Sequence, residues 1–92
     1  MPYEPTDSAK PIRLSRHARD NAARRGASEE EITRAVREAA WQPAESGRQE
    51  CRMDFPYGKE WNNKEYATKR VRPIFAEKDT EIVVVTVYVY YL

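Results

Sequence analysis

A run of β-branched and aromatic residues at the end of the chain constrains the fold more than any other segment. It reads EIVVVTVYVYYL, and side chains of this kind favour a half-buried, pleated strand. The run is too short for a membrane-spanning helix, which needs roughly 20 apolar residues. A basic and aromatic segment, NNKEYATKRVRPIFAE, precedes it and ends just before Lys78-Asp79. The two segments therefore predict an antiparallel hairpin with strands at about 65–77 and 81–91.

The alternation of side chains gives the last strand two different faces. One face carries only valines and a tyrosine, so we expect it to pack in the core: Val83, Val85, Val87, Val89 and Tyr91. Thr86 and Tyr88 then lie on the opposite, wetter face. On the neighbouring strand, the polar residues of one parity match this face, namely Tyr66, Thr68, Arg70 and Arg72. The sequence thus predicts a polar sheet face on which arginines accompany Tyr and Thr.

Two helices are predicted before the strands. Ser15 is a favoured N-cap for the first helix, and Gly26 is a favoured residue just after its end. Ser28 and Glu31 form a capping box at the start of the second helix, and Pro43 ends that helix. Apolar residues spaced by three and four positions give the second helix one buried face: Ile32, Ala35, Val36, Ala39 and Ala40.

A shorter strand is predicted at RQECRMDF, and the Pro-Tyr-Gly triplet that follows ends it. Pro73 cannot donate a hydrogen bond to a ladder, so we expect a β-bulge near it. The element order ααβββ predicts an α+β domain with two N-terminal helices packed on one face of a three-stranded antiparallel sheet. A chain of 92 residues has room for one such domain, at 12–92, after a flexible leader at 1–11.

The composition excludes several classes of function. A single His and a single Cys nearly exclude a tetrahedral zinc site, and we expect neither a metal nor another cofactor. One cysteine cannot form an internal disulfide, and the first residues lack the apolar core of a signal peptide. We therefore expect a cytoplasmic protein that does not contact a membrane. The net charge of +1 hides two basic segments, 10–25 and 61–78, which either form one patch for a polyanion or are separate solvated surfaces.

His17 is the candidate acid or base, because an imidazole can transfer protons near neutral pH. On a helix, His17, Asn21 and either Arg24 or Arg25 fall on one face. The alternative is that His17 packs between helix and sheet while these arginines are solvated. The arginine row of the sheet can hold phosphates while its tyrosines stack on bases, or both can form ordinary cross-strand contacts.

Four segments resemble the small bacterial proteins of the domain of unknown function 4258: LSRHARDNAARRGASEEEI, WQPAESGRQECRMDF, KEWNNKEYATKRVRPIF and EIVVVTVYVYY. The features shared with this family are the His of the first helix, the Arg-Gly pair before the acidic cap, the Gly-Arg before the first strand and the terminal V-T-V-Y. The resemblance covers about residues 12–92. That family is itself similar to the BrnT-like and RelE-like toxins, compact metal-independent ribonucleases built from helices and an antiparallel sheet.

The resemblance implies a metal-independent endoribonuclease in which a ribose 2′-OH attacks the adjacent phosphate. The catalytic residues would then be His17, Arg70 and Tyr88. The substrate would be held by Tyr66, Lys69, Arg72, Thr86 and either or both of Arg24 and Arg25. The expected partners are RNA and a protein antitoxin. The alternatives are a non-catalytic module that binds RNA or protein through the basic sheet face, and an interaction protein whose last strand pairs with a partner chain. The sequence leaves the oligomeric state open.

Overall fold

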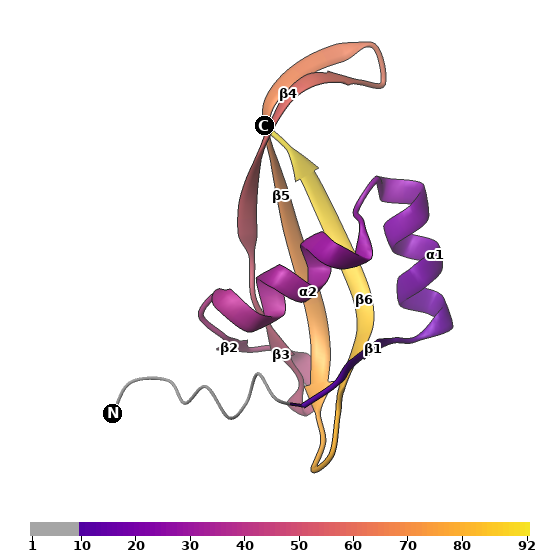
Figure 1. The fold of residues 1–92 in the computed structure, drawn as a ribbon, viewed down its shortest axis with the longest axis vertical. Coiled ribbons are helices and arrows are strands. Elements are labelled where there is room, and N and C mark those ends of the chain that lie inside the picture. Colours follow the sequence, from indigo (N-terminus) through magenta and orange to yellow (C-terminus); the bar gives the residue numbers. More distant parts are fainter. Residues whose placement is uncertain (1–9) are drawn as a thin grey trace.

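The computed structural model describes residues 10–92, which form a single α+β domain (Figure 1). The elements in chain order are β1 (Ile12–Leu14), α1 (Arg16–Arg25), α2 (Glu29–Glu38), β2 (Gln42–Pro43), the 3-10 turn η2 (Glu45–Gly47), β3 (Gln49–Glu50), β4 (Met53–Trp61), β5 (Lys64–Glu77) and β6 (Ile82–Tyr91). The predicted α+β class is confirmed, but the predicted three-stranded antiparallel sheet is wrong. The sheet of the described residues has six strands and is mixed, because β1 runs parallel to β6.

The strands follow the order β1-β6-β5-β3-β2, and β4 also pairs with β5. β5 is the central strand, since it pairs with β6 along one side and with β4 and then β3 along the other. The strands that the sequence did not predict are very short: β1 has three residues, and β2 and β3 have two each. Segments of this length show no alternation, so their pairing becomes visible only in the folded chain.

β4 differs most from its predicted form. It continues through Pro56 to Trp61, and its ladder with β5 shifts register between Pro56 and Lys59. This irregularity accommodates the Pro-Tyr-Gly triplet within the strand, so the triplet does not end it. The hairpin from β4 to β5 closes at Asn62-Asn63, whose φ angles of 52° and 67° are typical of a type I′ turn.

Both predicted helix starts are confirmed, with Ser15 capping α1 and the reciprocal capping box opening α2. Gly26 follows α1 in the left-handed conformation, at φ 88°, as the sequence predicts. The predicted end of the second helix is wrong, because α2 stops at Glu38 and Ala39 is already extended. Pro43 therefore lies in β2 and does not terminate a helix.

A register shift in the β5–β6 ladder changes part of the predicted face assignment. It leaves Val85 as an extra residue in β6, close to Pro73 as predicted. One extra residue reverses the alternation of side chains. Before the bulge, Val84 is completely buried in the core, whereas Val83 is buried but lies outside the core cluster, and Val85 is only partly buried. After the bulge, Val87 is buried as predicted.

The two helices lie on one side of the sheet. α2 crosses over β5 and β6, and α1 runs beside β6 (Figure 1). Between helices and sheet lies one apolar core, formed by Leu14, Ala18, Ala22, Ile32, Ala35, Val36, Cys51, Phe55, Val71, Phe75, Ile82, Val84 and Val87. The opposite side of the sheet carries neither helix. Among residues 10–92, no helix is long and apolar enough to cross a membrane.

The leader predicted at 1–11 falls mostly on residues 1–9, which lie outside the described residues. Lys10 and Pro11 belong to the folded domain. Lys10 Nζ lies 2.9 Å from Glu77 Oε2, and the Pro11 carbonyl accepts a hydrogen bond of 2.9 Å from the amide of Ile82. These contacts attach the two residues before Ile12 to the last two strands.

Candidate functional site

The side of the sheet without helices carries the polar row that the sequence predicts. Arg72 pairs with Tyr88 across the β5–β6 ladder, and Arg70 pairs with Tyr90. All four side chains are at least partly exposed. We call this surface the open face and define it by eight residues: Glu50, Arg52, Asp54, Arg70, Arg72, Thr86, Tyr88 and Tyr90.

Two arginines lie against the ring of Tyr88, which is 37% exposed. The guanidinium carbon of Arg25 is 5.1 Å from the ring centroid and that of Arg72 is 5.3 Å away. Arg25 reaches this position from the last turn of α1, and its Nη1 donates to the Val87 carbonyl at 2.8 Å. Cation–π contacts at exposed sites contribute about 0.5–1 kcal/mol each. The ring is thus held among cations at the border between β6 and α1.

Arg72 connects the two halves of the open face. Its Nη2 donates to Glu50 Oε1 at 2.6 Å, and its Nη1 donates to the Tyr90 hydroxyl at 3.1 Å. These hydrogen bonds, the one to Glu50 above all, raise the pKa of Arg72. Its Nε is buried and has no hydrogen-bond partner among the described residues. The guanidinium is therefore firmly oriented but retains one unused donor.

The remaining arginines of the open face differ in how tightly they are paired. Arg70 forms a two-pronged ion pair with Asp54, at 2.7 and 3.1 Å. This hydrogen bonding lowers the pKa of Asp54 and raises that of Arg70. Arg52 is held more loosely, with Nη2 3.9 Å from Glu50 Oε2 and a side chain that is 52% exposed. Of the three, Arg52 is the cation that can meet a ligand with least loss of existing contacts.

Two grooves run along the open face and share Arg72. The larger groove has a volume of about 670 Å³ and is lined by Pro43, Ala44, Glu45, Ser46, Arg48, Glu50, Arg72, Ile74, Thr86 and Tyr88. The smaller groove has a volume of about 250 Å³ and is lined by Arg52, Arg70, Arg72, Tyr90 and Leu92. The wall of the larger groove comes from the β2–β3 connection, which the sequence did not place near the arginines.

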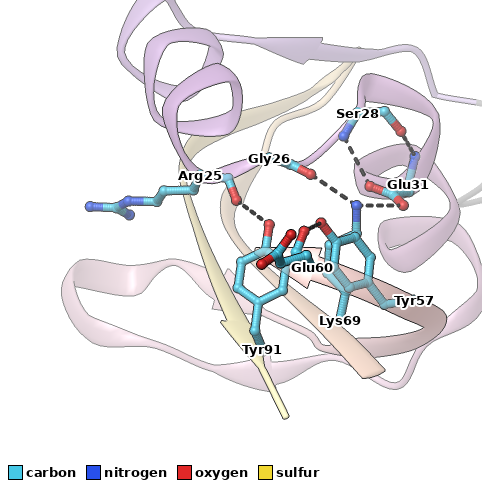
Figure 2. A network of polar contacts seen from close by, with 8 residues as sticks. All are labelled: Arg25, Gly26, Ser28, Glu31, Tyr57, Glu60, Lys69 and Tyr91. Carbon is cyan, nitrogen blue, oxygen red and sulfur yellow. Dashed lines mark hydrogen bonds and ion pairs between the residues drawn. The ribbon is translucent and has the colours of Figure 1, made fainter. Parts of the chain in front are cut away.

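Lys69 lies away from the other predicted substrate-binding residues. It follows the alternation of β5 and points to the helix side, where it is buried. Its Nζ donates to the Gly26 carbonyl at 2.9 Å and lies 3.0 Å from Glu31 Oε2 (Figure 2). A buried ammonium needs such partners to offset its desolvation. Lys69 therefore joins the helix corner to the sheet, and the structure does not bring it together with the arginines of the open face.

Tyr66 is also separated from the open face. Its ring centroid lies 5.8 Å from that of Tyr91, which belongs to an aromatic cluster with Trp61 and Tyr57 at 4.7 and 5.2 Å. The Tyr91 hydroxyl in turn donates to the Arg25 carbonyl at 2.6 Å (Figure 2). Tyr66 thus lies against this aromatic cluster and Lys64, and no contact among residues 10–92 joins it to Arg70.

The predicted row on the first helix is only partly formed. Asn21 is buried, donates from Nδ2 to Thr86 Oγ1 at 3.1 Å, and accepts from Arg24 Nη2 at 2.8 Å. His17 is exposed and has no hydrogen bond, ion pair or ring contact with any of residues 10–92. The structure therefore does not gather the predicted catalytic set, because nothing in the described chain links His17 to Arg70 or Tyr88.

Four residues of the open face were absent from the predicted site: Glu50, Arg52, Asp54 and Tyr90. The sequence contains a pattern that could have identified them. Charges of opposite sign occupy alternate positions 50, 52 and 54, and Tyr90 has the same parity as Tyr88. Alternation alone does not reveal that Glu50 pairs with Arg72, since the short β3 brings them together.

Neither metal binding nor thiol chemistry is supported at these positions. Among the described residues, no group of His, Cys, Asp and Glu side chains could hold a metal ion. Cys51 is buried and its thiol donates to the Ala35 carbonyl at 3.2 Å. Burial, together with the nearby Glu50, raises the pKa of Cys51 to about 12, which keeps the thiol protonated and unreactive at neutral pH.

Comparisons with protein-family models, with curated proteins and with solved structures find no match for this chain. The resemblance to the domain of unknown function 4258 stays a prediction from the sequence motifs. Function is therefore inferred from the chemistry of the open face.

Proposed function

We propose that the open face binds single-stranded RNA without cleaving it. The observation that carries the proposal is an exposed tyrosine pair on the face of the sheet that carries no helix, with Tyr88 and Tyr90 at 37% and 40% exposure among arginines. Aromatic rings on a sheet stack on unpaired bases, and guanidinium groups bind the phosphates between them. A duplex hides its base faces, so a single strand is the form of RNA that suits this surface.

The size and continuity of the two grooves support the same proposal. They join at Arg72, so a strand can follow the β5–β6 ladder from Tyr90 toward Tyr88. Arg25 and Arg52 stand at opposite ends of this path, one over Tyr88 and the other in the smaller groove. Such an arrangement supplies cations for successive phosphates and a ring beside each of them.

Carboxylates on the open face set a limit on its affinity. Asp54 and Glu50 already bind Arg70 and Arg72, so a phosphate has to compete with these ion pairs. We therefore expect moderate affinity with a modest dependence on salt concentration, because few cations release counterions on binding.

Pairing of the last strand with a partner chain has less structural basis. β1 already pairs with β6 over Ile82–Val84. Arg25 Nη1 binds the carbonyl of Val87 further along the same edge. The backbone groups that a partner strand would need are thus partly occupied.

If the open face binds RNA, two variants should bind it with lower affinity. Tyr90→Ala should weaken binding of a U-rich, labelled RNA oligonucleotide about tenfold, because stacking on one base contributes about 1–3 kcal/mol. Arg52→Ala should weaken binding severalfold. It should also make the negative slope of log association constant against log salt concentration shallower by about 0.7. Fluorescence anisotropy between about 50 and about 200 mM salt measures both effects.

Arg34→Ala is the matched control. Arg34 pairs with a glutamate as Arg52 does, its side chain is 50% exposed against 52%, but it lies on α2. This variant should bind as the unmodified protein does. Equal losses in both arginine variants, or binding that does not change with salt, would argue against the proposed face and favour a protein ligand.

Cleavage by a metal-independent mechanism is the second candidate, favoured by the exposure of His17 on the same helix as Asn21 and Arg25. Incubation of mixed RNA with excess protein and a chelator tests it. Products with 2′,3′-cyclic ends that disappear in His17→Ala would establish cleavage, and intact RNA would exclude it.

A further inference from the structure

Glu50 is an unexpected residue in a groove proposed to bind a polyanion. Its side chain is only 13% exposed, and Oε1 accepts the short hydrogen bond from Arg72 at 2.6 Å. The other oxygen, Oε2, has Arg52 Nη2 at 3.9 Å, which is beyond hydrogen-bond length. Among residues 10–92, Oε2 therefore has no hydrogen-bond donor. A half-buried carboxylate oxygen without a donor is a strong acceptor that a ligand can satisfy.

The surroundings of Glu50 suit a nucleobase better than a phosphate. The lining of the larger groove includes three apolar residues, Pro43, Ala44 and Ile74, which we take as its apolar wall. Arg72 fixes the carboxylate from one side, and Thr86 lines the same groove. A flat base can pack against the apolar wall while one of its edges meets the carboxylate. A phosphate at this position would instead face a negative charge.

Hydrogen-bond chemistry then distinguishes among the bases. Guanine presents two adjacent donors on its Watson–Crick edge, N1–H and the 2-amino group, which match the two oxygens of a carboxylate. Adenine, cytosine and uracil each present a donor beside acceptors, and a carboxylate repels those acceptors. While holding Arg72, Oε1 keeps a free lone pair, so both oxygens can accept from one base.

We infer that the larger groove selects guanine within single-stranded RNA, with Glu50 as the residue that reads the base. This inference rests on the proposed RNA binding and assigns a specificity to the same face. Arg72 positions the carboxylate, and the phosphates on either side of the guanine meet the arginines that flank the groove, Arg25 and Arg48.

The test uses labelled RNA hexamers of uridine that carry guanosine, inosine, adenosine or cytidine at one central position, with all-uridine RNA as reference. The guanosine hexamer should bind about tenfold more tightly than the uridine, adenosine and cytidine hexamers. Inosine lacks only the 2-amino group, so its hexamer should bind severalfold more weakly than the guanosine hexamer. This comparison needs no variant and is independent of any effect on folding.

Glu50→Gln provides the second arm. The amide oxygen can still accept from Arg72, but one carboxylate acceptor becomes a donor, so the preference for guanosine should disappear. Glu45→Gln is the control, because Glu45 lines the same groove, is exposed, and has a side chain without a hydrogen bond or ion pair to any of residues 10–92. It should keep the preference.

The outcomes separate this inference from the function on which it rests. Equal affinity for all five hexamers, with the salt dependence retained, overturns guanine selection and leaves RNA binding intact. A preference that survives in Glu50→Gln also overturns it. Failure of every hexamer to bind overturns RNA binding and the inference together.

Discussion

Among the three glycines, Gly26 is the one whose surroundings leave no room for a side chain. Its φ angle is 88°, and a Cβ atom there would meet the Tyr91 hydroxyl and approach the Trp61 ring to 3.0 Å. Its carbonyl accepts from Lys69, and the neighbouring Arg25 carbonyl accepts from Tyr91. One backbone corner thus joins α1 and α2 to the central and last strands, as Figure 2 shows.

Gly26→Ala should therefore lower the free energy of unfolding by about 2–4 kcal/mol. About 1–2 kcal/mol comes from the left-handed backbone, and the rest comes from displacing packed side chains. Gly47→Ala is the matched control, since Gly47 has φ 72° and nothing within 4 Å of the added Cβ. It should lose only the backbone contribution. Urea unfolding of both variants measures the difference, and equal losses would show that the clash with Tyr91 and Trp61 is relieved without cost.

At the level of elements, short sequence motifs correctly predicted the structures that form through local interactions. The capping box of α2 and the left-handed end of α1 depend on residues within one turn of the chain, and both are present. The alignment of Arg72 with Tyr88 followed from the two-residue period of neighbouring strands. These features needed no knowledge of distant contacts.

The features that the sequence did not predict depend on such distant contacts. β1 exists because it pairs with β6, whose first residue, Ile82, is far along the chain from Ile12. Pro73 indicated a bulge nearby, but it did not indicate that the extra residue would be Val85 on the neighbouring strand, which reverses the faces at the start of β6. The alternation of β5 places Lys69 on the face opposite to Arg70, but the partners that hold it there, Gly26 and Glu31, come from the distant helix corner.

The turn between β4 and β5 gives a prediction at this scale. Asn62 and Asn63 both have positive φ, which asparagine tolerates and alanine does not. Asn63→Ala should lower the free energy of unfolding by about 1 kcal/mol, whereas Asn63→Gly should stay within about 0.5 kcal/mol of the unmodified protein. Thermal and urea unfolding followed by circular dichroism measure both. Equal effects of Ala and Gly would contradict a type I′ turn at this position.

Considered as a whole, the molecule has two sides with different polar chemistry. The open face holds an exposed ion pair, Arg70–Asp54, which contributes little to stability because water and salt screen it, and a half-buried one, Arg72–Glu50. The helix side instead holds polar groups that are kept protonated. Burial raises the pKa of Cys51 to about 12, and burial also raises the pKa of Tyr91 to about 12, with smaller contributions from Tyr57 and Glu31.

These raised pKa values predict that stability falls with rising pH on the alkaline side. In the unfolded chain Cys51 loses its proton near its ordinary value of 9 and Tyr91 near 10, while the folded protein keeps both until about 12. The folded state then binds more protons, so the free energy of unfolding decreases as pH rises, by at most about 1.4 kcal/mol per pH unit for each retained proton. Urea unfolding at pH 8, 9 and 10 with a reducing agent measures the slope.

Cys51→Ala should flatten the dependence of the free energy of unfolding on pH between pH 8 and 10. Tyr91→Phe should leave this dependence nearly unchanged over the same range, because the contribution of the tyrosine begins only near pH 10. An unaltered slope in Cys51→Ala would mean that the thiol ionises in the folded core as easily as in water.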